Sequence, residues 1–239
     1  MSMNQAIPHD SAKLHVTGEA RYVDDIPLPT KTLHLAFGLS SIANGEIKSI
    51  DLSAVRAAPG VLDIILSKDL PFTNDVAPNA HDEQLLADTH VNFIGQPIFI
   101  VVAKAHTQAR YASTLAIIDY TEGKPIISID EAINSNNRFE EGPRIYETGD
   151  AVSALKSSAH SLEGKLELGG QEHFYLEGQA AIASLQDDGE MVIYSSTQHP
   201  TEIQHKVAET LGLDMHRVKV EVRRMGGGFG GKESQGNAL

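Results

Sequence analysis

The chain has 239 residues, contains no cysteine and carries a formal net charge of −13 at pH 7. Its length allows one large domain or two ordinary ones, each with its own core. The acidic balance and the lack of a basic stripe argue against nucleic acid as the main partner, because neutralising phosphates needs clustered Lys and Arg. The absence of cysteine excludes a disulfide framework, a thiolate zinc site and an iron–sulfur cluster held by this chain.

The beginning of the chain, MSMNQAIPHDSAK, has neither the basic start nor the apolar centre of a secretory signal. A continuous apolar run of 18 residues, the length that suggests a membrane helix, occurs nowhere in the sequence. We therefore expect a soluble, cytoplasmic protein without a membrane partner. Residues 1–15 are polar and predict an arm, with ordered structure beginning near Gly18.

The first half of the chain predicts an α/β unit. Apolar runs and turn residues indicate the following elements in chain order: a strand over 33–39, a helix over 52–57, a strand over 61–66, a strand over 98–103, a helix over 106–115 and a strand over 116–120. The polar stretch 71–89 has little periodicity, and we expect it to be a surface excursion. The closing strand, helix and strand are typical of a packed α/β unit.

Residues 123–158 are polar and irregular, which is typical of a connection between domains. A second unit is expected after them. Its predicted elements are a strand over 162–168, a strand pair over 179–185 and 191–195 joined by the turn Asp187-Asp188-Gly189, a helix from Pro200 to the stop at Gly212, and a strand over 218–222.

The stretch RRMGGGFGGKE, residues 223–233, follows the last predicted strand and partly fits two nucleotide-binding patterns. The dinucleotide pattern needs an acidic ribose ligand about 20 residues further on, whereas the sequence stops eight residues after Gly231. The phosphate-loop pattern needs Ser or Thr where Glu233 stands, and a carboxylate there would repel phosphates. A flexible linker is a third alternative, but such linkers are usually Gly/Ser mixtures. A loop of exposed N–H groups that approaches an anionic or oxo-bearing ligand fits the residues better.

A second unusual stretch is GGQEHFYLE, residues 169–177. Two glycines at the end of a strand allow a sharp turn, which can present Gln171 at a sheet edge. Its amide can donate to an oxo ligand without adding charge. From these residues alone, an ordinary strand end with a solvated glutamine is the favoured alternative. Histidine pairs with zinc-ligand spacing and a serine in a nucleophile-elbow context are both absent from the sequence.

Three stretches, GGQEHFYLE, TQHPTEIQHKVAETLGL and RRMGGGFGGKESQ, resemble the molybdenum-binding subunit of bacterial xanthine dehydrogenases and, more loosely, the molybdenum hydroxylases in general. The stretch HVTGEARYVDDIP is similar to the opening of that subunit. The resemblance implies an α+β fold. Its parts would be an α/β hammerhead domain over 15–122, a connector over 123–158, and an incomplete N-terminal part of the molybdopterin-binding domain over 159–239.

The resemblance also implies roles for individual residues. Gln171 would hydrogen-bond an oxygen ligand of molybdenum, and the backbone amide of Phe229 would lie against the same centre. Gly228 and Gly230 would contact the cofactor beside it, and Glu233 would bind and position a purine. The implied cofactor is molybdenum–molybdopterin, incompletely enclosed here, with FAD and a [2Fe–2S] cluster on partner subunits.

The function implied by this resemblance is purine hydroxylation, from hypoxanthine and xanthine to urate. The family's catalytic base lies beyond the matched part, so we expect no catalytic residue in this chain and no activity from it alone. Expected partners are the iron–sulfur/FAD subunit and the remainder of the molybdenum subunit. The alternative is a non-catalytic assembly module that docks on partner redox subunits. A phosphate-loop nucleotidase is disfavoured by Glu233.

Overall fold

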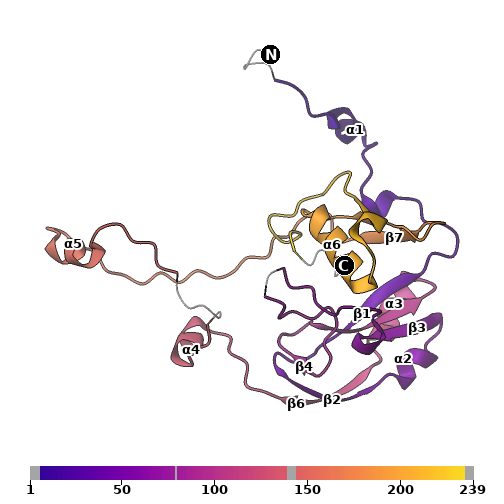
Figure 1. Cartoon of the computed structure of the whole chain (residues 1–239), viewed down its shortest axis with the longest axis horizontal. Helices are drawn as coiled ribbons and strands as arrows, with labels where there is room; N and C mark the ends of the chain where they lie inside the picture. The colour runs from indigo at the N-terminus through magenta and orange to yellow at the C-terminus, as the bar shows by residue number, and fades with distance from the viewer. Residues whose placement is uncertain (1–5, 79, 139–143, 235–239) are drawn as a thin grey trace. The chain divides into compact units, whose positions relative to one another are not determined.

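The computed structural model describes residues 6–78, 80–138 and 144–234. It divides into two compact units, one made of Met1–Gly123 with His173–Leu239 and the other of Lys124–Glu172. Figure 1 shows their elements coloured along the chain. The boundaries expected at 122 and 159 stay predictions.

The first half of the larger unit contains two antiparallel three-stranded sheets. In the first sheet the order is β1 (His34–Leu39), β5 (Pro97–Ala103), β3 (Val61–Leu66). In the second it is β4 (His90–Val91), β2 (Gly45–Asp51), β6 (Ile117–Glu122). The helix α3 (His106–Ser113) packs against β1 and β5, and α2 (Ser53–Ala57) precedes β3 (Figure 1). The predicted elements of this half are confirmed within two residues at each end, but β2 and β4 were not predicted.

The middle strand β5 carries much of the core of this half. Ile98, Phe99 and Val101 are all fully buried. On the neighbouring strand, Gly38 lies directly opposite Phe99 in the ladder. A Cβ at Gly38 would come within 2.0 Å of the Phe99 ring, so the glycine leaves the space that the ring fills.

The stretch 71–89 lies largely at the surface, as expected, but its apolar residues are packed inward. Val76, Leu85 and Leu86 are buried and form an apolar cluster with partly buried residues of the first sheet. Asn74 holds this segment, because its amide donates to Leu86 O at 2.8 Å and accepts from Leu86 N–H at 2.9 Å. This packing was not predicted, because these apolar residues are spaced too irregularly to show a period.

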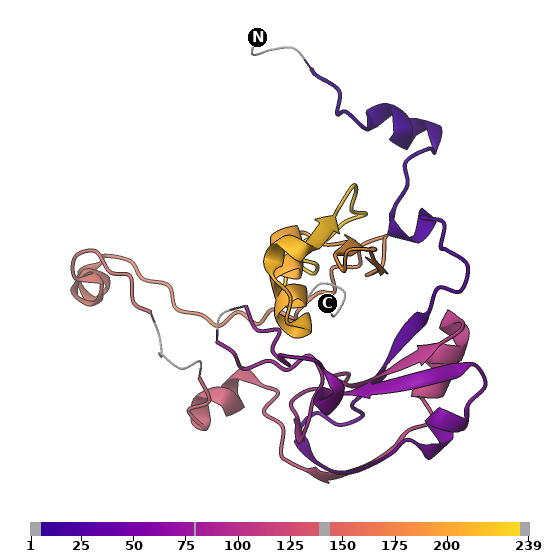
Figure 2. The same cartoon turned by 45° about the vertical axis from the view of Figure 1, so that its right-hand side comes forward.

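The second half of the larger unit is a small three-stranded sheet with one helix (Figure 2). Its strands, in spatial order, are β7 (Ala181–Leu185), β8 (Met191–Ser195) and β9 (Val218–Glu221). β7 and β8 form the predicted hairpin, and β9 runs parallel to β8. The helix α6 (Pro200–Leu211) begins at the predicted proline and ends at Gly212, which adopts φ 65°. α6 buries its apolar face against this sheet.

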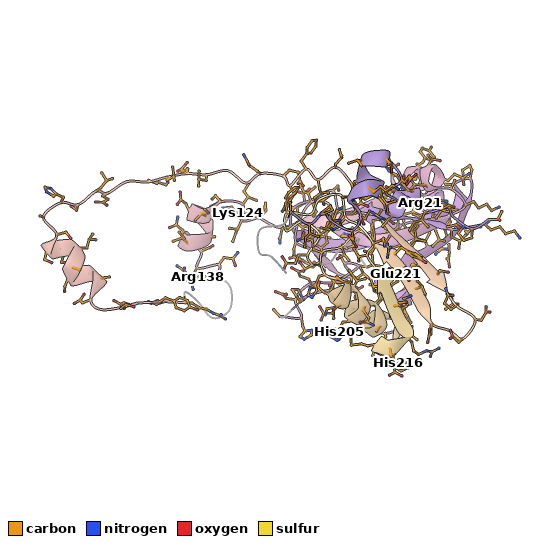
Figure 3. All side chains as sticks on the ribbon, turned by 90° about the horizontal axis from the view of Figure 1, so that it is seen from above. Arg21, Lys124, Arg138, His205, His216 and Glu221 are labelled. Atoms are coloured by element: carbon orange, nitrogen blue, oxygen red, sulfur yellow. The ribbon has the colours of Figure 1, made fainter. Side chains whose placement is uncertain are left out.

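The unit Lys124–Glu172 contains two short helices, α4 (Ile129–Asn134) and α5 (Ala151–Ser157). Each begins with a side-chain cap, Ser128 for α4 and Asp150 for α5. Figure 3 labels Lys124 and Arg138 on either side of α4. The predicted strand over 162–168 is wrong, because these residues form no strand and their three leucines are at least 81% exposed. Alternating leucines give a strand pattern, but a strand also needs a neighbour to pair with.

The remaining elements are short. The helix α1 (Ala12–Thr17) begins inside the stretch expected to be an unstructured arm. The described residues also form three single turns of 3₁₀ helix: η1 (Val23–Asp25), η2 (Ser67–Asp69) and η3 (Met215–Arg217). Within the described ranges, every helix is too short or too polar to cross a bilayer.

Candidate functional site

The candidate site is the segment 223–233, here called the glycine loop, which follows the end of β9. Figure 3 labels Glu221 at that end. The described part of the loop consists of bends and turns and opens no helix. Gly227, Phe229 and Gly230 have positive φ of 98°, 50° and 96°. The dinucleotide interpretation needs a helix opening at the glycines and is therefore not supported.

Lys232 is not available to a phosphate. Its side chain is fully buried, and its ammonium donates to Glu177 O at 2.8 Å. The same ammonium lies 3.4 Å from Glu177 Oε2 and 4.6 Å from the centre of the Tyr175 ring. A phosphate-loop lysine must reach its nucleotide, so the burial of Lys232 adds to the objection that Glu233 raises.

Gln198, which follows β8, holds the second half of the glycine loop. Its Oε1 accepts from Gly230 N–H at 2.9 Å and from Lys232 N–H at 3.2 Å. The backbone N–H of Gln198 donates to Lys232 O at 2.8 Å, and the Thr197 hydroxyl donates to the same oxygen at 3.1 Å. The second half of the loop is thus fastened to the end of the sheet.

Glu177 holds the first half of the loop. Gly226 N–H donates to Glu177 Oε2 at 2.7 Å, and Glu177 N–H donates to Gly226 O at 3.2 Å. A Cβ at Gly226 would come within 2.4 Å of Glu177 Cβ, and one at Gly228 within 2.5 Å of Gln198 Oε1. These two glycines therefore permit the close approach of the side chains that hold the loop.

The tip of the loop presents three consecutive backbone N–H groups, those of Gly227, Gly228 and Phe229. Among the described residues, none supplies an acceptor to any of the three. The Phe229 side chain is 77% exposed and lies in the left-handed region. Neutral donors on a fixed backbone are suited to an anionic or oxo-bearing group.

The structure brings four of the five predicted site residues into this loop. Gly228 is buried there, whereas Phe229, Gly230 and Glu233 are exposed. Gln171 is exposed and belongs to the unit Lys124–Glu172, so its pairing with Phe229 stays a prediction. The individual ligand roles of all five residues also stay predictions.

Sequence reasoning missed the residues that hold the loop in place, Glu177, Gln198 and buried Lys232. Glu177 lies in GGQEHFYLE, and Gln198 lies in TQHP. The available signal was that charged and amide residues occur inside the same unusual stretches as the glycines. Their contacts with the loop, however, join residues more than 30 positions apart.

Two family models match the chain. Residues 17–124 match the a/b hammerhead domain of aldehyde oxidase and xanthine dehydrogenase, and residues 133–239 match the molybdopterin cofactor-binding domain. The chain is 41% identical over 237 residues to a xanthine dehydrogenase of Oryza sativa subsp. japonica and 42% identical over 233 residues to one of Calliphora vicina. These alignments cover 98% and 97% of this chain but only 17% of each relative.

Solved structures agree with this assignment. The aldehyde oxidoreductase of Desulfovibrio gigas superposes with a TM-score of 0.82 at 28% identity, over 94% of this chain and 27% of that one. Quinoline 2-oxidoreductase of Pseudomonas putida 86 has a TM-score of 0.83 at 24% identity, over 97% of this chain and 31% of that one, which shows a shared fold. The predicted fold, a hammerhead domain followed by the start of a molybdopterin-binding domain, is confirmed. The chain belongs to the molybdenum hydroxylase family.

Proposed function

We propose that this chain forms part of the molybdenum site of a xanthine dehydrogenase, which hydroxylates hypoxanthine and xanthine to urate. Relatives about 41% identical along the chain carry that name. The observation that carries the proposal is the row of N–H groups at Gly227, Gly228 and Phe229, to which no described residue supplies an acceptor. Since the chain spans 17% of its relatives' length, activity would require polypeptide equivalent to the rest, and the chain alone would be inactive.

The glycine loop fits a molybdenum cofactor chemically. The oxygen and sulfur ligands of such a centre are electronegative, and neutral donors can orient them without altering the charge of the metal. The loop offers neutral donors at its tip, and Lys232, the cation that follows the glycines, is buried against Glu177. Phe229, Gly228 and Gly230 would hold the group from this loop, with Gln171 donating from its own segment. When bound, the cofactor supplies the redox chemistry of the hydroxylation.

Glu233 would bind the purine. Its side chain is exposed two residues beyond the last glycine, and its N–H donates to Gly230 O at 3.3 Å, which ties it to the loop's turn. An ionised carboxylate accepts from a purine N–H, and a protonated one in a dry pocket donates to a ring nitrogen. We assign no catalytic base to this chain. Electrons would pass to FAD and [2Fe–2S] groups on partner subunits in the cytoplasm.

The proposal is tested by Gln171→Ala in the complete assembly. Removing one neutral hydrogen bond to the centre should weaken cofactor retention by about 1 kcal/mol, which is roughly fivefold in affinity, or shift the reduction potential. Molybdenum per polypeptide and a potentiometric titration are the measurements. The matched control is Gln186→Ala, whose amide donates to Ser184 O beside the hairpin turn. Equal molybdenum content and equal potential in the two variants would contradict the role of Gln171.

A further inference from the structure

The buried ion pair between Glu177 and Lys232 has no role in the proposed binding of cofactor or purine. We propose that these two residues are positioning residues that hold the glycine loop in the conformation in which the Phe229 N–H donates to none of the described residues. The contacts by which Glu177 and Lys232 hold the loop lie entirely within this chain. Its consequence for a molybdenum centre rests on the proposed function.

The Glu177 carboxylate contacts the glycine loop on both sides of Phe229. Glu177 Oε2 accepts from Gly226 N–H at 2.7 Å and lies 3.4 Å from Lys232 Nζ. Gly226 and Lys232 stand at opposite ends of the segment that contains Phe229. The carboxylate therefore closes this segment, as a crosslink would. The N–H groups of Gly227, Gly228 and Phe229, which have no acceptor in the described part of the chain, lie between the two contacts.

Because this ion pair is buried, removing one of its charges should disturb the loop strongly. The exposed fraction of the side chain is 0% for Lys232 and 7% for Glu177. The ammonium has two more stabilising contacts, Glu177 O at 2.8 Å and the Tyr175 ring at 4.6 Å. Removing one partner of such a pair leaves a charge buried without compensation, whereas removing both charges together avoids that cost.

The same half of the unit contains an exposed pair for comparison. Lys219 Nζ and Glu221 Oε1 are 2.7 Å apart at the end of β9, but their side chains are 68% and 40% exposed. The Glu221 carboxylate is the leading cause, through its hydrogen bond, of the raised pKa of Lys219. Surface pairs of this kind contribute little to stability, so this pair is a matched control.

The test is a double-mutant cycle on this chain without cofactor, using Glu177→Gln, Lys232→Met and both together. Amide hydrogen exchange is followed in the peptide that contains Gly226, Gly230 and Lys232, with β8 as the internal reference. Each single variant should speed loop exchange by about tenfold or more, and the double variant should return to within about threefold of the wild type. Lys219→Met and Glu221→Gln should leave loop exchange unchanged.

The inference is overturned if the single variants behave like the control pair, or if the effects of the two single changes simply add in the double variant. Should a single variant unfold, recovery of the fold in the double variant supports the inference, and failure to recover it counts against it.

In the complete assembly, molybdenum content should fall with Lys232→Met and return with the double variant. If wild-type assembly holds no molybdenum while loop exchange responds as expected, the proposed function fails and the positioning role stands. If molybdenum is present but loop exchange does not respond, the positioning role fails.

Discussion

Replacing Glu233 by alanine in a complete assembly is expected to lower kcat/KM about 10²-fold or more while leaving the molybdenum content unchanged. Glu233 lies at the exposed end of the glycine loop, beyond the N–H groups assigned to the cofactor. A residue that binds the purine interacts with charge that is redistributed in the ring during hydroxylation. Removing that residue should therefore lower kcat/KM. The loss should differ between xanthine and hypoxanthine, because the two purines offer different groups at the ring edge.

The measurements are molybdenum per polypeptide and kcat/KM for both purines. Glu190→Ala is the matched control, since Glu190 is an exposed carboxylate that follows the hairpin turn before β8. It should leave both quantities unchanged. If Glu233→Ala lost the metal and kept its efficiency per molybdenum, Glu233 would be a cofactor residue and its assignment to the purine would be wrong.

Phe99→Ala is expected to lower the free energy of unfolding of the hammerhead domain by about 3–5 kcal/mol. Phe99 is fully buried in the middle strand β5, and its ring occupies the space opposite Gly38. The backbone of two adjacent strands cannot collapse into that space without breaking the β1–β5 ladder. A cavity therefore remains after the ring is removed, and its cost adds to the lost burial.

The measurement is denaturation by urea, with Phe93→Ala as the control because the Phe93 side chain is 54% exposed. The control should change the free energy of unfolding by no more than about 0.5 kcal/mol. A loss below about 1 kcal/mol for Phe99→Ala would show that the core is not organised around β5.

Elements with strong local signals were predicted well. The apolar run 98–103 indicated a strand, and β5 is a strand that lies in the middle of its sheet. α6 begins at Pro200 and ends at Gly212 because proline suits the first helical turn and glycine adopts the left-handed conformation that ends one. In both cases the information lies within the element itself.

Elements that depend on a distant partner were predicted poorly. Residues 162–168 alternate leucines with charges, yet they pair with no strand among the described residues. The strand β2 was missed because its register shifts between Ile47 and Ser49, and this irregularity weakens the alternation of apolar residues. Pairing partners far along the chain decide such strands, and a local pattern does not contain them.

The candidate site shows the same limit. The glycines predicted a loop of exposed N–H groups that approaches a ligand. In the structure the N–H groups of Gly227, Gly228 and Phe229 have no acceptor among the described residues, Gly228 itself is buried, and the contact with a ligand stays a prediction. The burial of Lys232 could not be predicted, because its partner Glu177 is 55 residues away. A lysine after glycines was therefore compared with phosphate-binding loops, whereas the fold uses it as an internal ion-pair partner.

The central claim is that the glycine loop holds a molybdenum cofactor. Its most direct test is anomalous X-ray diffraction at the molybdenum absorption edge, on crystals of the complete assembly that contains this chain. We predict a molybdenum peak beside the loop tip, with an oxygen ligand of the metal within hydrogen-bonding distance of the Phe229 N–H. A molybdenum peak elsewhere, with the glycine loop facing only protein or solvent, would contradict the claim.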